Sequence, residues 1–371
     1  MIKVLVVGQT PPPFGGQAVM IKKLLEGQFK HIELYHVRMA FSGDMNEIGR
    51  FRVNKIFHMI SVILQIIWMR FRNGIDVIYY SPAGPNKVPI YRDFAILILT
   101  RWLFSQTVFH FHAGGLSERV KTLSLPEKWL SRLAYSHADC AIRLSTLNPE
   151  DGKQLQAKRD IVIPNGLEDN YNSSYPKQNK IPIILFVAVL SPSKGLNILL
   201  DACKQLKDDG IQFKLELMGR FHSAEFEKKA KEKIATFGIS SYVELLGVKS
   251  GDDKWKAFGR ADIFCFPSFF EAETFGLVVL EAMQFQLPVV STHWRGIPSL
   301  VQDGKTGYLV PIKNAEAVAA KLRLLLEDES KRKIMGKKGR ELFLKEFMID
   351  KWYCRMEKAF INTINPNKEK T

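Results

Sequence analysis

The sequence predicts an α/β protein of two doubly wound domains, each built on a parallel β-sheet. Short runs rich in Val, Ile and Leu alternate with longer segments of helical character, the βαβ pattern of parallel sheets. These runs form two series that are separated by a polar, turn-rich stretch. The length of 371 residues also suits two domains of ordinary size.

The apolar runs locate the expected strands in order along the chain. In the first domain they lie at residues 3–7, 33–37, 77–80, 107–112, 140–144 and 160–163. In the second domain they lie at residues 183–189, 214–218, 243–246, 263–267, 288–291 and 307–310. The segment 168–180 (EDNYNSSYPKQNK) reads as a linker. We therefore expect domains over residues 1–170 and 171–345, followed by a helical tail over 346–371.

An apolar run at residues 56–69 predicts an amphipathic helix in the first domain, too short to span a bilayer. One stripe of this helix carries Ile56, Ile60, Ile63 and Ile67, which we expect to face the core. Basic residues flank the run: Arg50, Arg52, Lys55, Arg70 and Arg72. These charges either solvate the ends of a core helix or dock it on an anionic membrane surface.

The composition limits the classes of partner and cofactor. A formal net charge of +15 favours an acidic partner, and no nucleic-acid-binding motif is present. The four cysteines are too scattered for a zinc site or a disulfide framework, so reduced thiols are expected. No Asp-x-Asp pair occurs, which favours chemistry without a metal or other cofactor.

The most informative window contains two carboxylates, Glu273 and Glu281, with Phe275 and Gly276 between them. We expect a loop that ends at Glu273 and a helix that begins near Gly276 and carries Glu281. The two carboxylates, about 12 Å apart along a helix axis, could each bind a diol. The amides of the helix start could bind an anion between them. A nucleotide-sugar presents its groups in this order: a hexose diol, a diphosphate and a ribose diol. The alternative interpretation is that Glu273 is an ordinary carboxylate at a helix N-terminus and Glu281 an ordinary surface glutamate.

This window resembles the signature of glycosyltransferase family 4, retaining enzymes with the GT-B fold of two Rossmann-like domains facing across a cleft. The signature E-x-F-G-x-x-x-x-E-A-M is present at residues 273–283. The segments at 288–292, 296–298 and 303–311 match the family as well. The resemblance covers nearly the whole chain and implies that the C-terminal helix crosses back to the first domain.

The resemblance implies a set of site residues. The expected catalytic residues are His112, Glu273 and Lys194, and His110 is a lesser candidate. The expected donor-binding residues are Gly16, Lys194, Gly219, Arg220, Glu273, Phe275, Gly276 and Glu281. In the family, Glu281 would hold the ribose, Glu273 the hexose and Lys194 the diphosphate, while the glycine loop at Gly16 would face the donor across the cleft.

One position departs from the family pattern. The strand before Lys194 normally ends in Gly-Arg, and here Ala188 and Val189 stand in those places. Stabilisation of the leaving group would then depend on Lys194, on helix amides, and on Arg220 or Arg295.

The resemblance implies transfer of a hexose from a nucleoside-diphosphate sugar to an acceptor hydroxyl. We expect a lipid-linked glycan acceptor in cell-surface polysaccharide synthesis, on the cytoplasmic face of the membrane. A nucleotide-sugar 2-epimerase of the same fold is one alternative. A non-catalytic nucleotide-sugar-binding or membrane-docking subunit is the other.

Overall fold

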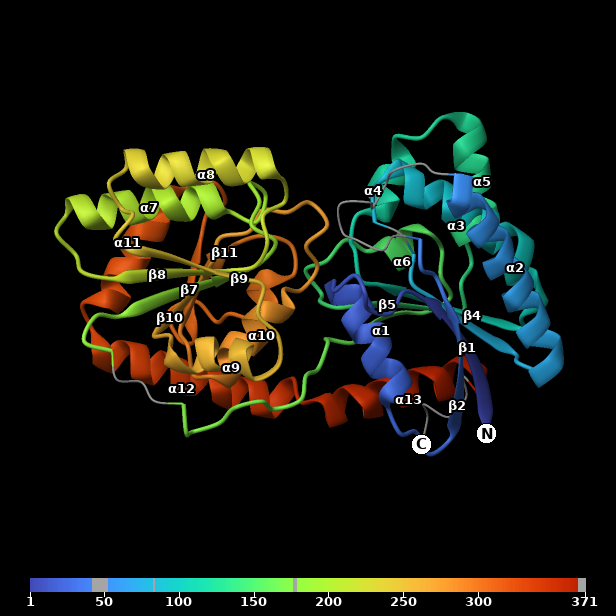
Figure 1. Cartoon of the computed structure of the whole chain (residues 1–371). Helices are drawn as coiled ribbons and strands as arrows, with labels where there is room; N and C mark the ends of the chain where they lie inside the picture. The colour runs from blue at the N-terminus through green and yellow to red at the C-terminus, as the bar shows by residue number, and fades with distance from the viewer. Residues whose placement is uncertain (42–52, 83, 176–178, 366–371) are drawn as a thin grey trace. The chain divides into compact units, whose positions relative to one another are not determined.

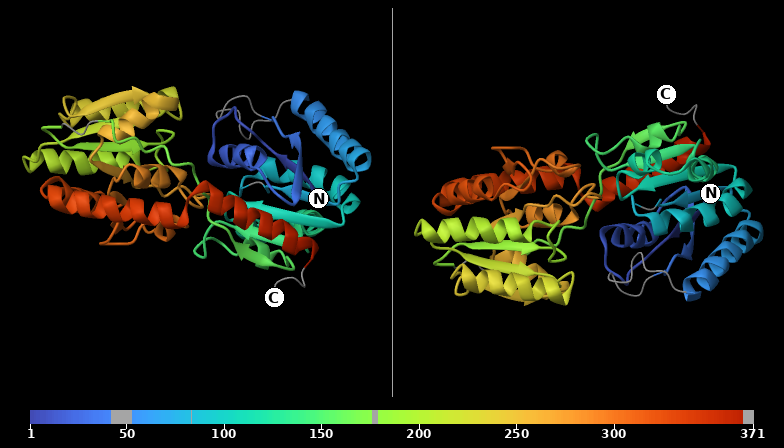
Figure 2. Two further views of the ribbon diagram at one scale, coloured as in Figure 1. Left: turned by 90° about the horizontal axis from the view of Figure 1, so that it is seen from below. Right: turned by 90° about the horizontal axis from the view of Figure 1, so that it is seen from above.

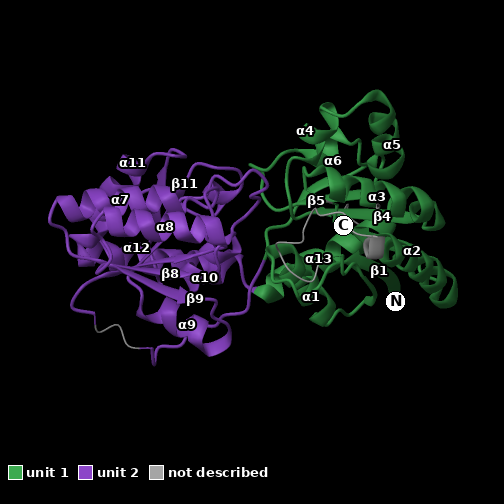
Figure 3. Ribbon diagram, turned by 45° about the horizontal axis from the view of Figure 1, so that its top comes forward, with its two compact units in different colours: residues 1–165, 349–371 green, residues 166–348 purple. Residues whose placement is uncertain are grey.

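The computed structural model describes residues 1–41, 53–82, 84–175 and 179–365, which fold into two compact units. Unit 1 comprises Met1–Asn165 and Ile349–Thr371, and unit 2 comprises Gly166–Met348 (Figure 3). Each unit contains one six-stranded parallel sheet with helices on both faces (Figure 1). The predicted fold class is confirmed.

The sheet of unit 1 has the strand order β2-β1-β3-β4-β5-β6. Its strands are β1 (Ile2–Gly8), β2 (Ile32–Arg38), β3 (Val77–Tyr80), β4 (Gln106–Phe111), β5 (Cys140–Arg143) and β6 (Asp160–Val162). Its helices are α1 (Gly16–Glu26), α2 (Val53–Asn73), α3 (Lys87–Thr100), the 3-10 turn η2 (Arg101–Leu103), α4 (Leu116–Lys121), α5 (Leu125–Tyr135), α6 (Asp151–Gln154) and α13 (Ile349–Ile364).

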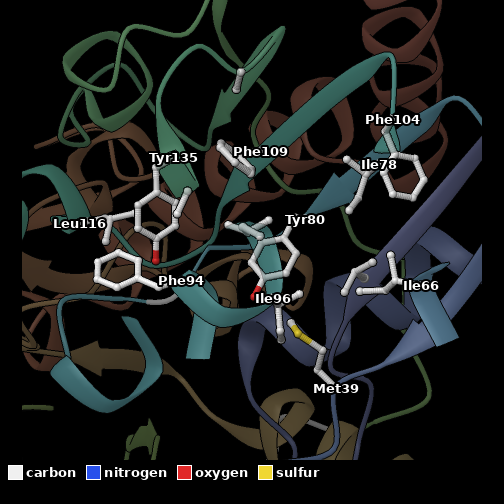
Figure 4. Close-up of a cluster of buried hydrophobic side chains, with 14 of the residues drawn as sticks. Met39, Ile66, Ile78, Tyr80, Phe94, Ile96, Phe104, Phe109, Leu116 and Tyr135 are labelled. Atoms are coloured by element: carbon white, nitrogen blue, oxygen red, sulfur yellow. The ribbon is translucent and has the colours of Figure 1, made fainter. Parts of the chain in front are cut away.

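The main core of unit 1 lies between the sheet and the layer formed by α2, α3 and α5. Ile66 of α2, Phe94 of α3 and Tyr135 of α5 are buried in one cluster with Tyr80 and Phe109 of the sheet (Figure 4). Because the crossovers of parallel strands are right-handed, the direction in which the chain moves along the sheet decides the face that each helix covers. The connections from β2 to β5 all run in one direction, which places these three helices together.

The last helix, α13, packs on the other side of unit 1. Trp352, Met356 and Phe360 on this helix are buried, and the ring of Phe360 lies 5.9 Å from that of Tyr79. Figure 2 shows α13 beside the strands of this unit. The tail of the chain thus completes the core of the unit that contains the N-terminus.

Unit 2 has the strand order β12-β11-β10-β7-β8-β9. Its strands are β7 (Ile183–Val187), β8 (Lys214–Met218), β9 (Val243–Gly247), β10 (Ile263–Phe266), β11 (Val289–Thr292) and β12 (Gly307–Val310). Its helices are α7 (Leu196–Asp208), α8 (Ala224–Thr236), α9 (Gly251–Arg260), α10 (Leu277–Gln284), the 3-10 turn η3 (Ile297–Ser299), α11 (Ala315–Leu326) and α12 (Glu329–Glu346).

The predicted core stripe of α2 holds for Ile63, which packs against the core, and is wrong for Ile56 and Ile60. Ile56 and Ile60 are 39% and 47% exposed, whereas Val62 and Ile66 are fully buried. The helix is apolar on more than one face, so the hydrophobic period alone does not identify the side that contacts the sheet. The helix does pack as a crossover between β2 and β3, with Val62 and Ile66 facing the core.

Candidate functional site

The candidate site of unit 2 lies at the carboxyl ends of β7 and β10. The chain moves outward from β7 through β8 to β9, then returns to β10 and moves outward in the opposite direction. The gap between β7 and β10 is therefore a topological switch point, where open α/β sheets bind their ligands. Lys194 follows β7 and Glu273 follows β10.

Lys194 and Glu273 form an ion pair across this switch point. The Lys194 ammonium donates to Oε2 of Glu273 at 2.7 Å, and the two side chains are 21% and 10% exposed. The hydroxyl of Ser268 donates to the same oxygen at 3.2 Å. The ammonium also lies 4.5 Å from the ring centroid of Phe270, a cation–π geometry. A cation and a carboxylate are thus held together at the ligand-binding edge of the sheet.

Two helices begin at this edge with open N-termini. Gly195 caps α7 and Gly276 caps α10, both in the left-handed conformation (φ 87° and 84°) and neither with a side-chain cap. A Cβ on Gly195 would lie 2.1 Å from the carbonyl oxygen of Pro267, so only glycine fits there. Uncapped N-terminal amides are suited to bind an anion such as a diphosphate.

Glu281 lies on α10 and has a cationic partner that the sequence did not indicate. The Lys254 ammonium of α9 donates to Oε1 of Glu281 at 2.5 Å, with side-chain exposures of 21% and 12%. Oε2 of Glu281 is buried and accepts no hydrogen bond. The Lys254 ammonium lies 4.7 Å from the ring centroid of Trp255. Glu281 is therefore held by one oxygen and retains acceptor capacity on the other.

Three further residues of unit 2 that were predicted to bind the donor, Phe275, Gly219 and Arg220, differ in burial and in backbone contacts. Phe275 is buried against Phe347 with ring centroids 6.0 Å apart, so its backbone rather than its ring is available to a ligand. Gly219 follows β8 at φ 141°, and a Cβ there would lie 1.8 Å from the carbonyl oxygen of Ala188. The backbone of Arg220 accepts a hydrogen bond from the Leu190 amide at 2.8 Å, beside the place of the absent family arginine.

The predicted histidines of unit 1 form a buried cluster with Tyr79. The Tyr79 hydroxyl lies 2.7 Å from Nδ1 of His110 and 3.5 Å from Nε2 of His112. Burial lowers the pKa of His112 to about 3, and burial and the neighbouring imidazole lower the pKa of His110 well below 6.5. Both rings are therefore neutral at pH 7, and His112 is suited to hydrogen bonding rather than to proton donation as a cation.

Gly16 begins α1 directly after the loop that follows β1. Gly15 is the N-cap of this helix, with no side-chain cap, and Gly16 itself is exposed. The arrangement at the edge of the first sheet thus repeats that of α7 and α10: a glycine-rich loop followed by an open helix N-terminus. No group of three His, Cys, Asp or Glu among the residues that the structure describes could hold a metal ion.

The membrane candidates are only partly described. Arg50 and Arg52 lie outside the described residues, and Lys55 is described in its backbone alone. Arg70 is only partly exposed, donates to the Leu103 carbonyl oxygen at 2.8 Å and pairs with Asp76 at 3.2 Å. Arg72 is exposed, with its guanidinium 5.0 Å from the ring centroid of Trp68.

The architecture matches solved structures along its whole length. Anabaena HepE, solved in complex with UDP, has a TM-score of 0.74 at 20% identity, with 97% of this chain and 100% of that chain covered. Two doubly wound units of this kind define the GT-B fold class, and this chain has that fold.

Two curated relatives and a family model identify the family. Residues 168–342 match the model "Glycosyl transferases group 1". An uncharacterized glycosyltransferase of Methanocaldococcus jannaschii is 26% identical over 97% of this chain and 98% of its own length. The putative colanic acid biosynthesis glycosyltransferase WcaL of Escherichia coli K12 is 26% identical over 71% of this chain, but the match spans only 64% of that relative. Over residues 168–342, the chain belongs to the group 1 glycosyltransferases, glycosyltransferase family 4.

Proposed function

We propose that this chain transfers a hexose from a nucleoside-diphosphate sugar to an acceptor hydroxyl, with retention of the anomeric configuration and without a metal. The observation that carries the proposal is the Lys194–Glu273 ion pair at the β7/β10 switch point, beside two open helix N-termini. Glu281, on the second of these helices, adds a carboxylate with an unused acceptor oxygen. UDP in the HepE complex supports the choice of donor class.

In the proposed mechanism Glu281 accepts hydrogen bonds from the ribose and Glu273 from the hexose. Lys194 leaves its ion pair to stabilise the diphosphate, together with the amides at Gly276 and α7, and Gly219 and Arg220 lie toward the base. The bond between the anomeric carbon and the diphosphate oxygen breaks with both electrons going to that oxygen. The acceptor oxygen bonds to the anomeric carbon on the same face, and its proton passes to the leaving phosphate.

The roles proposed for unit 1 are those of a neutral hydrogen-bonding group and a backbone contact. His112, uncharged at pH 7, would bond to a sugar hydroxyl near the anomeric centre, and the amide at Gly16 would bind the sugar or phosphate. We propose that the acceptor is a lipid-linked glycan of cell-surface polysaccharide synthesis at the inner face of the membrane. The relation to WcaL, named for colanic acid biosynthesis, supports this acceptor class.

A thermal-shift screen followed by a turnover assay tests the proposal. The screen uses UDP, GDP, ADP and dTDP and their hexose derivatives, and binding raises the melting temperature by mass action. The selected donor is then incubated with and without a lipid extract that supplies acceptor. Transfer into the lipid fraction is expected. Epimerised donor instead would favour the 2-epimerase, and binding without any turnover would favour a binding subunit. No shift with any nucleotide would contradict the donor site itself.

A further inference from the structure

The helical layer of unit 1 carries apolar side chains on its solvent side. On α2, five large residues are exposed at successive spacings of three, four, four and three positions, which places them on one stripe. They are Phe57, Ile60, Leu64, Trp68 and Phe71, with exposed fractions between 47% and 69%. Val62 and Ile66, on the opposite side of the helix, are fully buried against the sheet.

Helix α3 and the turn η2 repeat this spacing. Val88, Tyr91, Leu99 and Trp102 are exposed by 44% to 75%, and Ala95 fills the remaining position of the stripe. The acidic residue of this helix, Asp93, lies on the inner side instead. Asp93 is fully buried, where it accepts hydrogen bonds from the Tyr80 and Tyr135 hydroxyls at 2.6 and 3.1 Å and pairs with Arg92 at 2.8 Å.

Helix α5 adds a third apolar stripe beside the other two. Leu125, Trp129 and Leu133 are exposed by 82%, 61% and 46%. Helix α3 packs against both α2 and α5, and the inner sides of all three contribute to one core (Figure 1). Their stripes therefore face the same way, and we call them together the outer helical face. An apolar surface spread over three adjacent helices is uncommon on a monomeric soluble protein.

We propose that the outer helical face is a membrane-binding surface that inserts its aromatic side chains into the interface of an anionic bilayer. Trp and Tyr prefer the boundary between headgroups and acyl chains, and Trp68, Tyr91, Trp102 and Trp129 lie on this face. None of the described helices is long and apolar enough to cross a bilayer, so the side chains enter only the boundary region.

The charges of the same helices favour anionic lipid over a second protein. The exposed basic residues on or next to the three helices are Arg72, Lys87, Lys121 and Arg132. The exposed acidic residues on or next to the three helices are fewer. Asp93 is buried, Glu127 accepts hydrogen bonds from Tyr91 and Ser124, Asp76 pairs with Arg70, and Glu118 is exposed on α4. A second copy of this chain docked on the face by two-fold symmetry would place basic residues opposite basic residues. An anionic headgroup layer complements both the charge and the apolar stripes.

Insertion and purely electrostatic adsorption differ in their salt dependence. Exposed charges are screened at high ionic strength, whereas burial of apolar side chains is not. Binding of the full chain to phosphatidylcholine–phosphatidylglycerol vesicles is measured by co-sedimentation at low salt and at 0.5 M salt, with no nucleotide present. The assay therefore does not depend on the proposed transfer reaction. We expect binding to persist at 0.5 M salt.

Matched variants separate the outer helical face from exposed apolar residues elsewhere. The double variant Leu64→Ser/Trp68→Ser should reduce the vesicle partition coefficient at least tenfold. Ile334→Ser/Leu344→Ser, which removes similarly exposed residues from α12 of unit 2, should change it less than twofold. Arg72→Gln and Arg132→Gln should each reduce binding at low salt by about fivefold. Circular dichroism and thermal unfolding exclude variants that fail to fold.

Tryptophan fluorescence gives an independent test of insertion. The six tryptophans divide evenly between the outer helical face (Trp68, Trp102, Trp129) and other positions (Trp255, Trp294, Trp352). Lipids brominated on the acyl chain should quench the wild-type emission. Replacing Trp68, Trp102 and Trp129 together by Phe should abolish this quenching while preserving binding to the vesicles.

Loss of binding at 0.5 M salt, absence of quenching, or equal effects of the two Ser double variants would overturn the proposal. A stable dimer that the Leu64→Ser/Trp68→Ser variant converts to monomer would assign the face to a second copy instead.

Discussion

The two carboxylates of the candidate site should lose different parts of donor recognition when each is changed to glutamine. We expect Glu281→Gln to weaken binding of the free nucleoside diphosphate, because its carboxylate is proposed to hold the ribose. We expect Glu273→Gln to reduce transfer without weakening that binding, because its carboxylate is proposed to contact the hexose and not the nucleotide. The isosteric amide retains the shape of both sites.

The contacts of Glu281 set the size of the first effect. One oxygen of Glu281 accepts from Lys254 at 2.5 Å, and the other has no partner. A ribose hydroxyl therefore gains about one charge-assisted hydrogen bond, which contributes roughly 1.5–3 kcal/mol. At about 1.4 kcal/mol per factor of ten, the dissociation constant should rise by about tenfold to a hundredfold.

The ion pair of Glu273 leads to the opposite expectation for the second variant. Lys194 is bound to Glu273 at 2.7 Å in the unliganded structure, so a diphosphate must compete with this carboxylate for the cation. Removing the negative charge frees Lys194. Because the Lys194 side chain is 21% exposed and water competes for its ammonium, the gain should be at most about 1 kcal/mol, or about a fivefold tighter binding.

Isothermal titration with the nucleoside diphosphate chosen by the thermal-shift screen measures both constants. Lys194→Met is the matched control, since it should weaken nucleotide binding whichever carboxylate holds the ribose. Equal loss of nucleotide binding in the two glutamine variants would refute the assignment of separate roles, as would a larger loss in Glu273→Gln.

Three further outcomes are expected. Gly195→Ala should destabilise unit 2 by at least about 2 kcal/mol more than Gly210→Ala. Both glycines have positive φ, but only Gly195 would place a Cβ against the Pro267 carbonyl oxygen. Urea unfolding measures both losses of stability, and equal losses would show that they arise from the backbone conformation alone. The buried neutral His110 and His112 take up protons only on unfolding, so below the unfolded pKa of 6.5 stability should fall as the pH drops toward 3. This contributes about 1.4 kcal/mol per pH unit for each histidine, and a double glutamine variant should show a shallower pH slope of the urea midpoint. Transfer should survive EDTA treatment, and its loss with recovery on adding Mg²⁺ or Mn²⁺ would contradict metal-independent chemistry.

The strands could be predicted from the sequence because parallel strands, buried on both faces, appear as continuous apolar runs. The predicted runs at 77–80, 214–218 and 307–310 coincide with β3, β8 and β12, and the others differ at their ends by one or two residues. The helix that begins next to Gly276 was also predicted, since glycine at a helix start and the following apolar residues are local signals.

Features that depend on distant contacts were not predicted. The break between α12, which ends at Glu346, and α13, which begins at Ile349, is one such feature: there the Phe347 carbonyl oxygen accepts a hydrogen bond from the Leu167 amide at 2.9 Å. The partner of Glu281, Lys254, lies on a different helix, and no spacing in the sequence relates the two. The buried side of α2 was assigned only partly correctly, because the side that faces the core depends on the sheet and not on the helix alone.

The position of α13 has a consequence for how the protein emerges from the ribosome. Unit 2 is inserted into unit 1: the chain enters it at Gly166 and leaves it at Met348, and Leu167 pairs with Met348 in a parallel bridge. Unit 2 is therefore complete in the nascent chain while unit 1 still lacks Trp352, Met356 and Phe360, which are buried in its core. The strands of unit 1 are synthesised first, but its core cannot be completed until α13, the last helix of the chain, has been synthesised. The face of its sheet that α13 covers is then the surface that a chaperone would encounter during translation.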